Sequence, residues 1–129
     1  MKPISSKLLE KASRAIHAAE VLLREGDIDF AAGRIYYAMF YCAKAMLVHL
    51  GLIEFTKHAA VHAAYGENFA KTQLLEPKFH RWLIQSFDKR LKADYDVDDV
   101  LKLEDVELMI QQAHEFLDAV RQYLMRLSP

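Results

Sequence analysis

The stretch from Asp27 to Leu50 reads DIDFAAGRIYYAMFYCAKAMLVHL, and its apolar residues cover every side of a helical wheel. Beyond its acidic start, only Arg34, Lys44 and His49 interrupt it with side chains that carry or readily gain a charge. A helix that is apolar all round must be enclosed by its neighbours. We therefore predict a central helix over residues 27–50 with other helices packed around it.

One stripe of this predicted helix is polar, with Arg34, Tyr37, Tyr41 and Lys44 at helical spacing. It brings two cations and two phenol hydroxyls into or beside the core, where each needs a partner. As a ligand site, the stripe would hold a phosphate and stack a base. As a structural feature, Arg34 would pair with Asp94 or another carboxylate, and the tyrosines would be core residues.

The length and charge of the chain set its class. A chain of 129 residues suits one domain, spanning residues 1–129, that can bury a core without disulfides or metal. Seventeen basic against eighteen acidic residues give no global field that would attract nucleic acid or an anionic membrane. Any such contact has to come from a local patch.

We expect a soluble, cytoplasmic protein without a membrane span. The N-terminus lacks the apolar core of a signal peptide. The stretch 27–50 would be about 36 Å long as a helix, but Arg34 and Lys44 near its middle argue against a bilayer crossing. The single cysteine, Cys42, lies among apolar neighbours and is predicted to be a buried free thiol in a reducing compartment.

The rest of the chain has mostly helical periodicity. Gly26, Gly51 and Pro77 fall where helices should end or begin. The predicted helices cover residues 6–25, 27–50, 57–72, 77–92 and 104–127, with an acidic connection over 95–101. Short connections between long helices favour an all-α fold, an antiparallel bundle of about five helices.

Three ordered motifs carry a family resemblance. The second predicted helix matches the pattern R-x-Y-Y-A-x-F-x-x-A-K-A-L, with methionine in the last place: Arg34, Tyr36, Tyr37, Ala38, Phe40, Ala43, Lys44, Ala45 and Met46. His58 and Val61 open the third helix, and an intact R-x-x-A-D-Y motif follows as Arg90, Ala93, Asp94 and Tyr95. Together these motifs resemble the HEPN domain (higher-eukaryote and prokaryote nucleotide-binding), in its small stand-alone prokaryotic form.

The third-helix motif departs from the family pattern K-T-H-S-G-V. The order of lysine and threonine is reversed as Thr56 and Lys57, and Ala59 and Ala60 replace the serine and glycine. The missing serine removes a hydroxyl that a ligand could have contacted.

The resemblance implies a HEPN-like bundle that binds a nucleotide or RNA and forms a homodimer. It also implies pairing with a minimal nucleotidyltransferase in a toxin–antitoxin-like module. Tyr95 would then be a candidate modification site for that partner. Nothing in the resemblance calls for a cofactor.

The ribonuclease motif of the wider superfamily is absent. That motif is an arginine followed, after four to six residues, by a histidine, which supplies a phosphate-binding cation and a base for the ribose 2′-hydroxyl. None of the seven arginines has a histidine at that separation, and the slots after Arg90 hold Tyr95, Asp96 and Val97. We therefore expect no catalytic residue. Two alternatives stay open: a metal-independent ribonuclease with a rearranged site, and a purely structural interaction protein.

Arg90 and Asp94 lie four residues apart, so they share one helical face. In a ligand site, Arg90 would bind an anion and Asp94 would orient it. In a structural role, the pair would fix the end of the fourth helix against Arg34.

His58 and His62 have a spacing that can chelate a metal, but a stable site needs further ligands. A satisfied or surface histidine is the favoured interpretation, and we expect no metal. His58 is retained as a nucleotide contact because of its place in the motif.

The aspartates 94, 96, 98 and 105 resemble a calcium loop only superficially, because Asp99 stands where such a loop needs glycine. Acidic residues that favour the start of the last helix explain this run better.

The predicted ligand-binding set therefore combines anion contacts, aromatic contacts and the R-x-x-A-D-Y motif. It comprises Arg34, Tyr37, Tyr41, Lys44, His58, Arg90, Asp94 and Tyr95.

Overall fold

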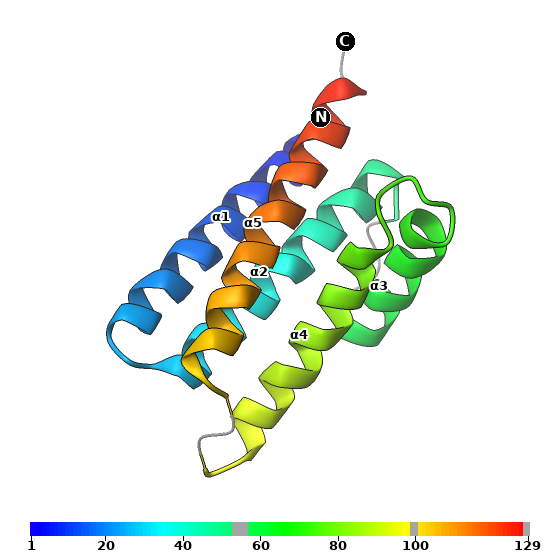
Figure 1. The fold of residues 1–129 in the computed structure, drawn as a ribbon. Coiled ribbons are helices and arrows are strands. Elements are labelled where there is room, and N and C mark those ends of the chain that lie inside the picture. The colour runs from blue at the N-terminus through cyan, green and yellow to red at the C-terminus, as the bar shows by residue number, and fades with distance from the viewer. Residues whose placement is uncertain (53–56, 99–100, 128–129) are drawn as a thin grey trace.

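The computed structural model describes residues 1–52, 57–98 and 101–127. Over these residues the chain forms helices and no strand, which confirms the predicted all-α class (Figure 1). The helices are α1 (Pro3–Arg24), α2 (Ile28–His49), α3 (His58–Tyr65), α4 (Lys78–Tyr95) and α5 (Leu103–Arg126), with a π-helical segment at Gly66–Ala70. No described helix combines the length and the apolar character that a membrane crossing requires.

The central position of α2 is as predicted. It packs against α1, α3, α4 and α5, and Figure 1 shows it running through the middle of the bundle. Most of its side chains are buried, including Ile35, Met39 and Met46, which are fully enclosed. Cys42 is a buried free thiol, and burial raises its pKa well above the ordinary range. The enclosed face fixes α2 rigidly, so the few residues on its open side have defined positions.

Two glycines end helices, as the sequence predicts. Gly26 follows α1 with φ of +87°, and Gly51 follows α2 with φ of +82°. This left-handed conformation strains other residues, whereas glycine adopts it freely. Asp27 precedes α2, and its side chain makes no capping hydrogen bond among the described residues.

The fourth helix is longer than predicted. It continues past residue 92 to Tyr95, so the whole R-x-x-A-D-Y motif is helical. The ion pair between Arg90 and Asp94 supports this last turn. Residues 99 and 100 of the expected acidic connection lie outside the described residues, as does Thr56. At the start of α5, Asp105 Oδ2 accepts a hydrogen bond from the backbone N–H of Lys102 at 2.9 Å, as its acidic first turn suggests.

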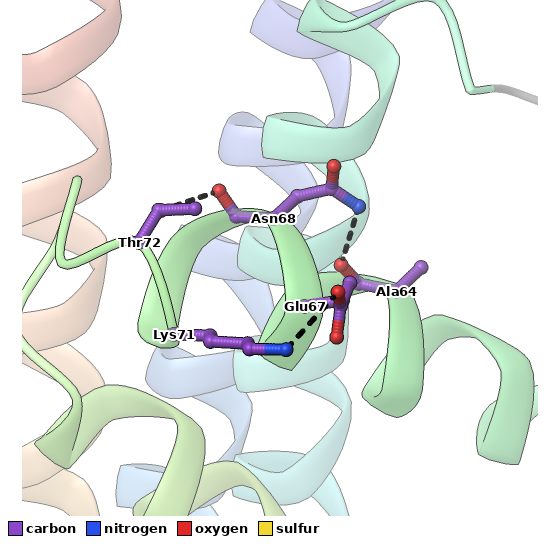
Figure 2. Close-up of polar contacts among 5 residues, drawn as sticks. All are labelled: Ala64, Glu67, Asn68, Lys71 and Thr72. Carbon is purple, nitrogen blue, oxygen red and sulfur yellow. Dashed lines mark hydrogen bonds and ion pairs between the residues drawn. The ribbon is translucent and has the colours of Figure 1, made fainter.

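The third helix is not one regular helix over residues 57–72. α3 ends at Tyr65, and the chain continues as a π-helical turn in which Lys71 N–H donates to Gly66 O at 2.9 Å. Figure 2 shows one physical reason: the Asn68 amide donates to Ala64 O at 2.8 Å, so a side chain competes for an α-helical acceptor. The Thr72 hydroxyl then donates to Asn68 O at 2.7 Å (Figure 2).

The apolar residues of α5 are largely buried, with Val106, Phe116 and Val120 fully enclosed. Leu127 is an exception, because it follows the end of α5 and is 52% exposed. Ile110 is only half-buried.

Candidate functional site

A pocket of about 390 Å³ opens between the first turns of α2 and the last turns of α4. On α2 the lining residues stand at positions i, i+3, i+4 and i+7, which share one helical face. α4 contributes two residues four positions apart. The full lining is Leu22, Phe30, Gly33, Arg34, Tyr37, Arg90 and Asp94.

Two arginines pack against one aromatic ring in this pocket. The Cζ atoms of Arg34 and Arg90 each lie 5.1 Å from the centroid of the Tyr37 ring. A guanidinium at that distance is attracted by the ring electrons. The structure thus brings together the cations of two sequence motifs that lie more than fifty residues apart.

The two arginines differ in their charge partners. Arg90 forms an ion pair with Asp94, with Nε 3.2 Å from Oδ2. Among the described residues, no carboxylate lies within 4.0 Å of the Arg34 guanidinium, and Arg34 is exposed. The predicted structural pair between Arg34 and Asp94 is therefore wrong over this part of the chain, because Asp94 pairs within α4 instead. The pocket holds one neutralised cation and one that is open to an anion.

A second polar cluster, formed by Tyr36, His58 and His62, lies next to Arg90. The Tyr36 ring is fully buried, and its hydroxyl lies 2.5 Å from His58 Nδ1 and 2.8 Å from His62 Nε2. A phenol has one proton, so it donates to one imidazole and accepts from the other. The Arg90 guanidinium lies 5.7 Å from the centroid of the Tyr36 ring, which links the cluster to the pocket.

Burial sets the protonation of this cluster. It raises the pKa of Tyr36 well above the ordinary value, although Arg90 acts in the opposite direction. Burial, together with the charges of His58 and His80, lowers the pKa of His62 to about 4. Burial and Arg90 also lower the pKa of His58. Both imidazoles that contact Tyr36 are therefore neutral near pH 7.

His58 and His62 thus both contact the hydroxyl of Tyr36. The described residues contain no group of three or more histidine, cysteine or carboxylate side chains that could hold a metal ion. His58 also packs against the Tyr37 ring, with ring centroids 5.7 Å apart, so it lies next to the pocket without lining it.

The other predicted site residues lie farther from the pocket. Tyr41 packs against Tyr37, with ring centroids 6.1 Å apart, and Lys11 Nζ lies 5.0 Å from the centroid of the Tyr41 ring. Lys44 is half-buried and stands ten residues after Arg34, about 15 Å along the helix axis. Tyr95 ends α4 and is 80% exposed. None of Tyr41, Lys44 and Tyr95 is among the residues that line the pocket.

Sequence reasoning missed four residues here, namely Leu22, Phe30, Gly33 and Tyr36. Tyr36 looks like a core aromatic, although two histidines four residues apart could have suggested a shared partner. Phe30 and Gly33 carry no chemical signal of their own. They stand four positions and one position before Arg34, on the helical face where the polar stripe starts.

Comparison with known proteins gives consistent matches. Residues 5–123 match the HEPN domain family, as the sequence motifs suggest. A protein of Methanocaldococcus jannaschii named "Putative toxin MJ0142" is 36% identical over 92% of this chain and 80% of its own length. A second from that organism, "Putative toxin MJ0605", is 32% identical over 93% of this chain and 88% of its own. "UPF0332 protein glr0978" of Gloeobacter violaceus is 30% identical over 96% of this chain and 98% of its own.

Proposed function

The chain belongs to the HEPN domain family, and we propose that it is a toxin-like, non-catalytic module that binds a nucleotide or an RNA end between α2 and α4. The toxin names of two relatives support the toxin-like role. One observation carries the binding role: Arg34 and Arg90 both pack against the Tyr37 ring in a single open pocket.

The pocket suits a phosphate. The Arg34 guanidinium offers a planar set of donors that matches a phosphate, and no described carboxylate within ion-pair distance competes for it. Tyr37 packs against both guanidiniums and limits their movement, which lowers the entropic cost of ordering them beside an anion. Asp94 holds Arg90 in place.

A titration of the four ribonucleoside monophosphates by isothermal calorimetry tests this proposal. We expect Arg34→Ala to weaken binding about tenfold or more, because it removes charge-assisted hydrogen bonds. Arg90→Ala should weaken binding as well, because it removes the cation that pairs with Asp94 and packs on Tyr37. Arg14→Ala is the matched control, since Arg14 is an exposed arginine of α1 that does not line the pocket.

The same variants distinguish binding from a purely structural role. If the arginines served only the fold, thermal melts of Arg34→Ala and Arg90→Ala would drop while nucleotide affinity stayed unchanged. A wild-type protein that binds none of the nucleotides would leave the proposal without support.

The family membership also supports a partner. We expect a homodimer that works with a minimal nucleotidyltransferase, for which the exposed Tyr95 hydroxyl is an accessible acceptor of the nucleotidyl group.

The dimer contact can be placed on exposed apolar residues. Met125, which is 64% exposed, is a candidate dimer contact, whereas Trp82 is half-buried against Phe79. A native mass spectrum would report the oligomer, and a mass increase after incubation with nucleotidyltransferase and ATP, lost in Tyr95→Phe, would report the modification.

A second candidate function is a metal-independent ribonuclease with a rearranged site. One observation favours it: His58, a neutral imidazole, lies close enough to Arg90 for that charge to lower its pKa. A base beside a phosphate-binding cation is what cleavage at a ribose 2′-hydroxyl needs. Incubation with labelled tRNA tests this, and activity has to disappear in both His58→Ala and Arg90→Ala. Activity that survives either substitution points to a contaminating nuclease.

A further inference from the structure

The pocket offers groups of opposite charge to one ligand. Asp94 is part of the lining, and its side chain is 40% exposed. A carboxylate has about four acceptor positions and no donor, and the ion pair with Arg90 approaches only Oδ2. The pocket therefore keeps hydrogen-bond acceptors in addition to the open cation of Arg34. A ligand that satisfies both has an anion at one end and a donor edge at the other.

The lining also offers room for a planar ring. Phe30 lines the pocket with 69% of its surface exposed, and exposed aromatic rings stack well on nucleobases. Gly33, between Phe30 and Tyr37 on the same face, has no other group within 4 Å of the position that a Cβ atom would occupy. The space beside Phe30 is therefore open.

We propose that the pocket selects guanine nucleotides, with the phosphate bound by Arg34 and the base edge by Asp94. This assignment rests on the proposed nucleotide binding at the same site. Guanine presents two adjacent donors, N1–H and the 2-amino group, which match the two oxygens of one carboxylate. Adenine and cytosine place an acceptor nitrogen beside their amino group, which a carboxylate repels, and uracil has a single donor.

The charge pattern agrees with this orientation. A phosphate beside Asp94 would be repelled by its carboxylate, so the phosphate belongs at Arg34, where no described carboxylate lies within ion-pair distance. The base then lies between Phe30 and Asp94. Arg90, held by Asp94 and packed on Tyr37, separates the two ends of the site.

Calorimetric titration of GMP, IMP, XMP and AMP tests the assignment. We expect GMP to bind about tenfold more tightly than IMP, which lacks the 2-amino donor, and more tightly than AMP. Asp94→Asn should reverse the preference toward XMP, because the asparagine amide can donate to the 2-carbonyl of xanthine. Asp96→Asn is the matched control, since Asp96 is an exposed aspartate two residues away that does not line the pocket.

The outcomes separate the two proposals. Equal affinities for GMP and AMP, or a preference that Asp94→Asn leaves unchanged, would overturn the guanine assignment while nucleotide binding still held. No binding of any of the four nucleotides would overturn both.

Discussion

Tyr36 and Tyr65 are both fully buried, but their hydroxyls have different environments. The Tyr36 hydroxyl contacts two imidazole nitrogens, whereas the Tyr65 hydroxyl has no hydrogen-bond partner among the described residues. A buried polar group without a partner costs free energy relative to its hydrated state. At the scale of single residues, the same substitution should therefore have opposite consequences at these two sites.

We predict that Tyr36→Phe lowers the free energy of unfolding by about 1–3 kcal/mol, because it takes the hydrogen-bond partner from the buried His62 Nε2 and the partly buried His58 Nδ1. Tyr65→Phe should be neutral or slightly stabilising, since it removes a buried hydroxyl that lacks a partner. Urea denaturation of both variants measures the difference. Equal losses in the two variants would mean that the hydrogen bonds of Tyr36 contribute nothing beyond its ring.

The lowered pKa of His62 predicts a dependence of stability on acid. The unfolded chain binds a proton at this histidine near pH 6.5, but the folded chain does so only near pH 4. The unfolded state therefore binds more protons between these values, and stability falls as the pH drops from about 6.5 toward 4. The loss should reach roughly 3 kcal/mol. His58, whose pKa is also lowered, acts in the same direction, and Asp88 opposes it at His62.

Urea denaturation at pH 7.0, 5.5 and 4.5 measures this loss. His62→Gln removes the titrating group, so its free energy of unfolding should fall less steeply over the same interval. Parallel curves for the two proteins would show that His62 is not the group responsible.

At the scale of secondary-structure elements, the sequence predicts helices well where burial is the dominant signal. The all-round apolar pattern of α2 and the two helix-ending glycines are found where expected. The packing of α4 against the start of the π-helical segment was not predictable, because it depends on contacts across the fold. A Cβ atom at Gly66 would lie 2.7 Å from His80 Nε2, and that imidazole donates to His62 O at 3.1 Å. The local sequence pattern around Gly66 does not indicate that His80 of α4 packs so closely against it.

We predict that Gly66→Ala destabilises the protein by about 1–3 kcal/mol, although alanine is the better helix former. The added methyl group would displace the His80 ring and break its hydrogen bond to His62 O. Thermal melts of a double-mutant cycle with His80→Ala isolate this effect. In the His80→Ala background, Gly66→Ala should become neutral or stabilising. A loss of equal size in both backgrounds would rule out the clash.

At the scale of the whole molecule, α2 is both the centre of the core and one wall of the pocket. Burial of most of α2 holds its open side in position, so Arg34 of α2 and Arg90 of α4 both contact the Tyr37 ring. The sequence indicated both arginines and Asp94 through their motifs. It could not indicate Phe30 and Gly33, because an exposed phenylalanine and an empty space beside a glycine are defined only by the surrounding helices.

Gly33 allows the central claim, ligand binding in the pocket between α2 and α4, to be tested apart from the fold. A glycine inside a helix costs about 1 kcal/mol relative to alanine, and the space around Gly33 is open. A larger side chain there should be tolerated by the helix and should fill the pocket. The most direct measurement is therefore a calorimetric GMP titration of Gly33→Leu beside the wild type, with a thermal melt of each. We predict an unchanged or higher melting temperature and a loss of GMP affinity of tenfold or more. A well-folded Gly33→Leu protein that binds GMP as tightly as the wild type would contradict the pocket as the binding site.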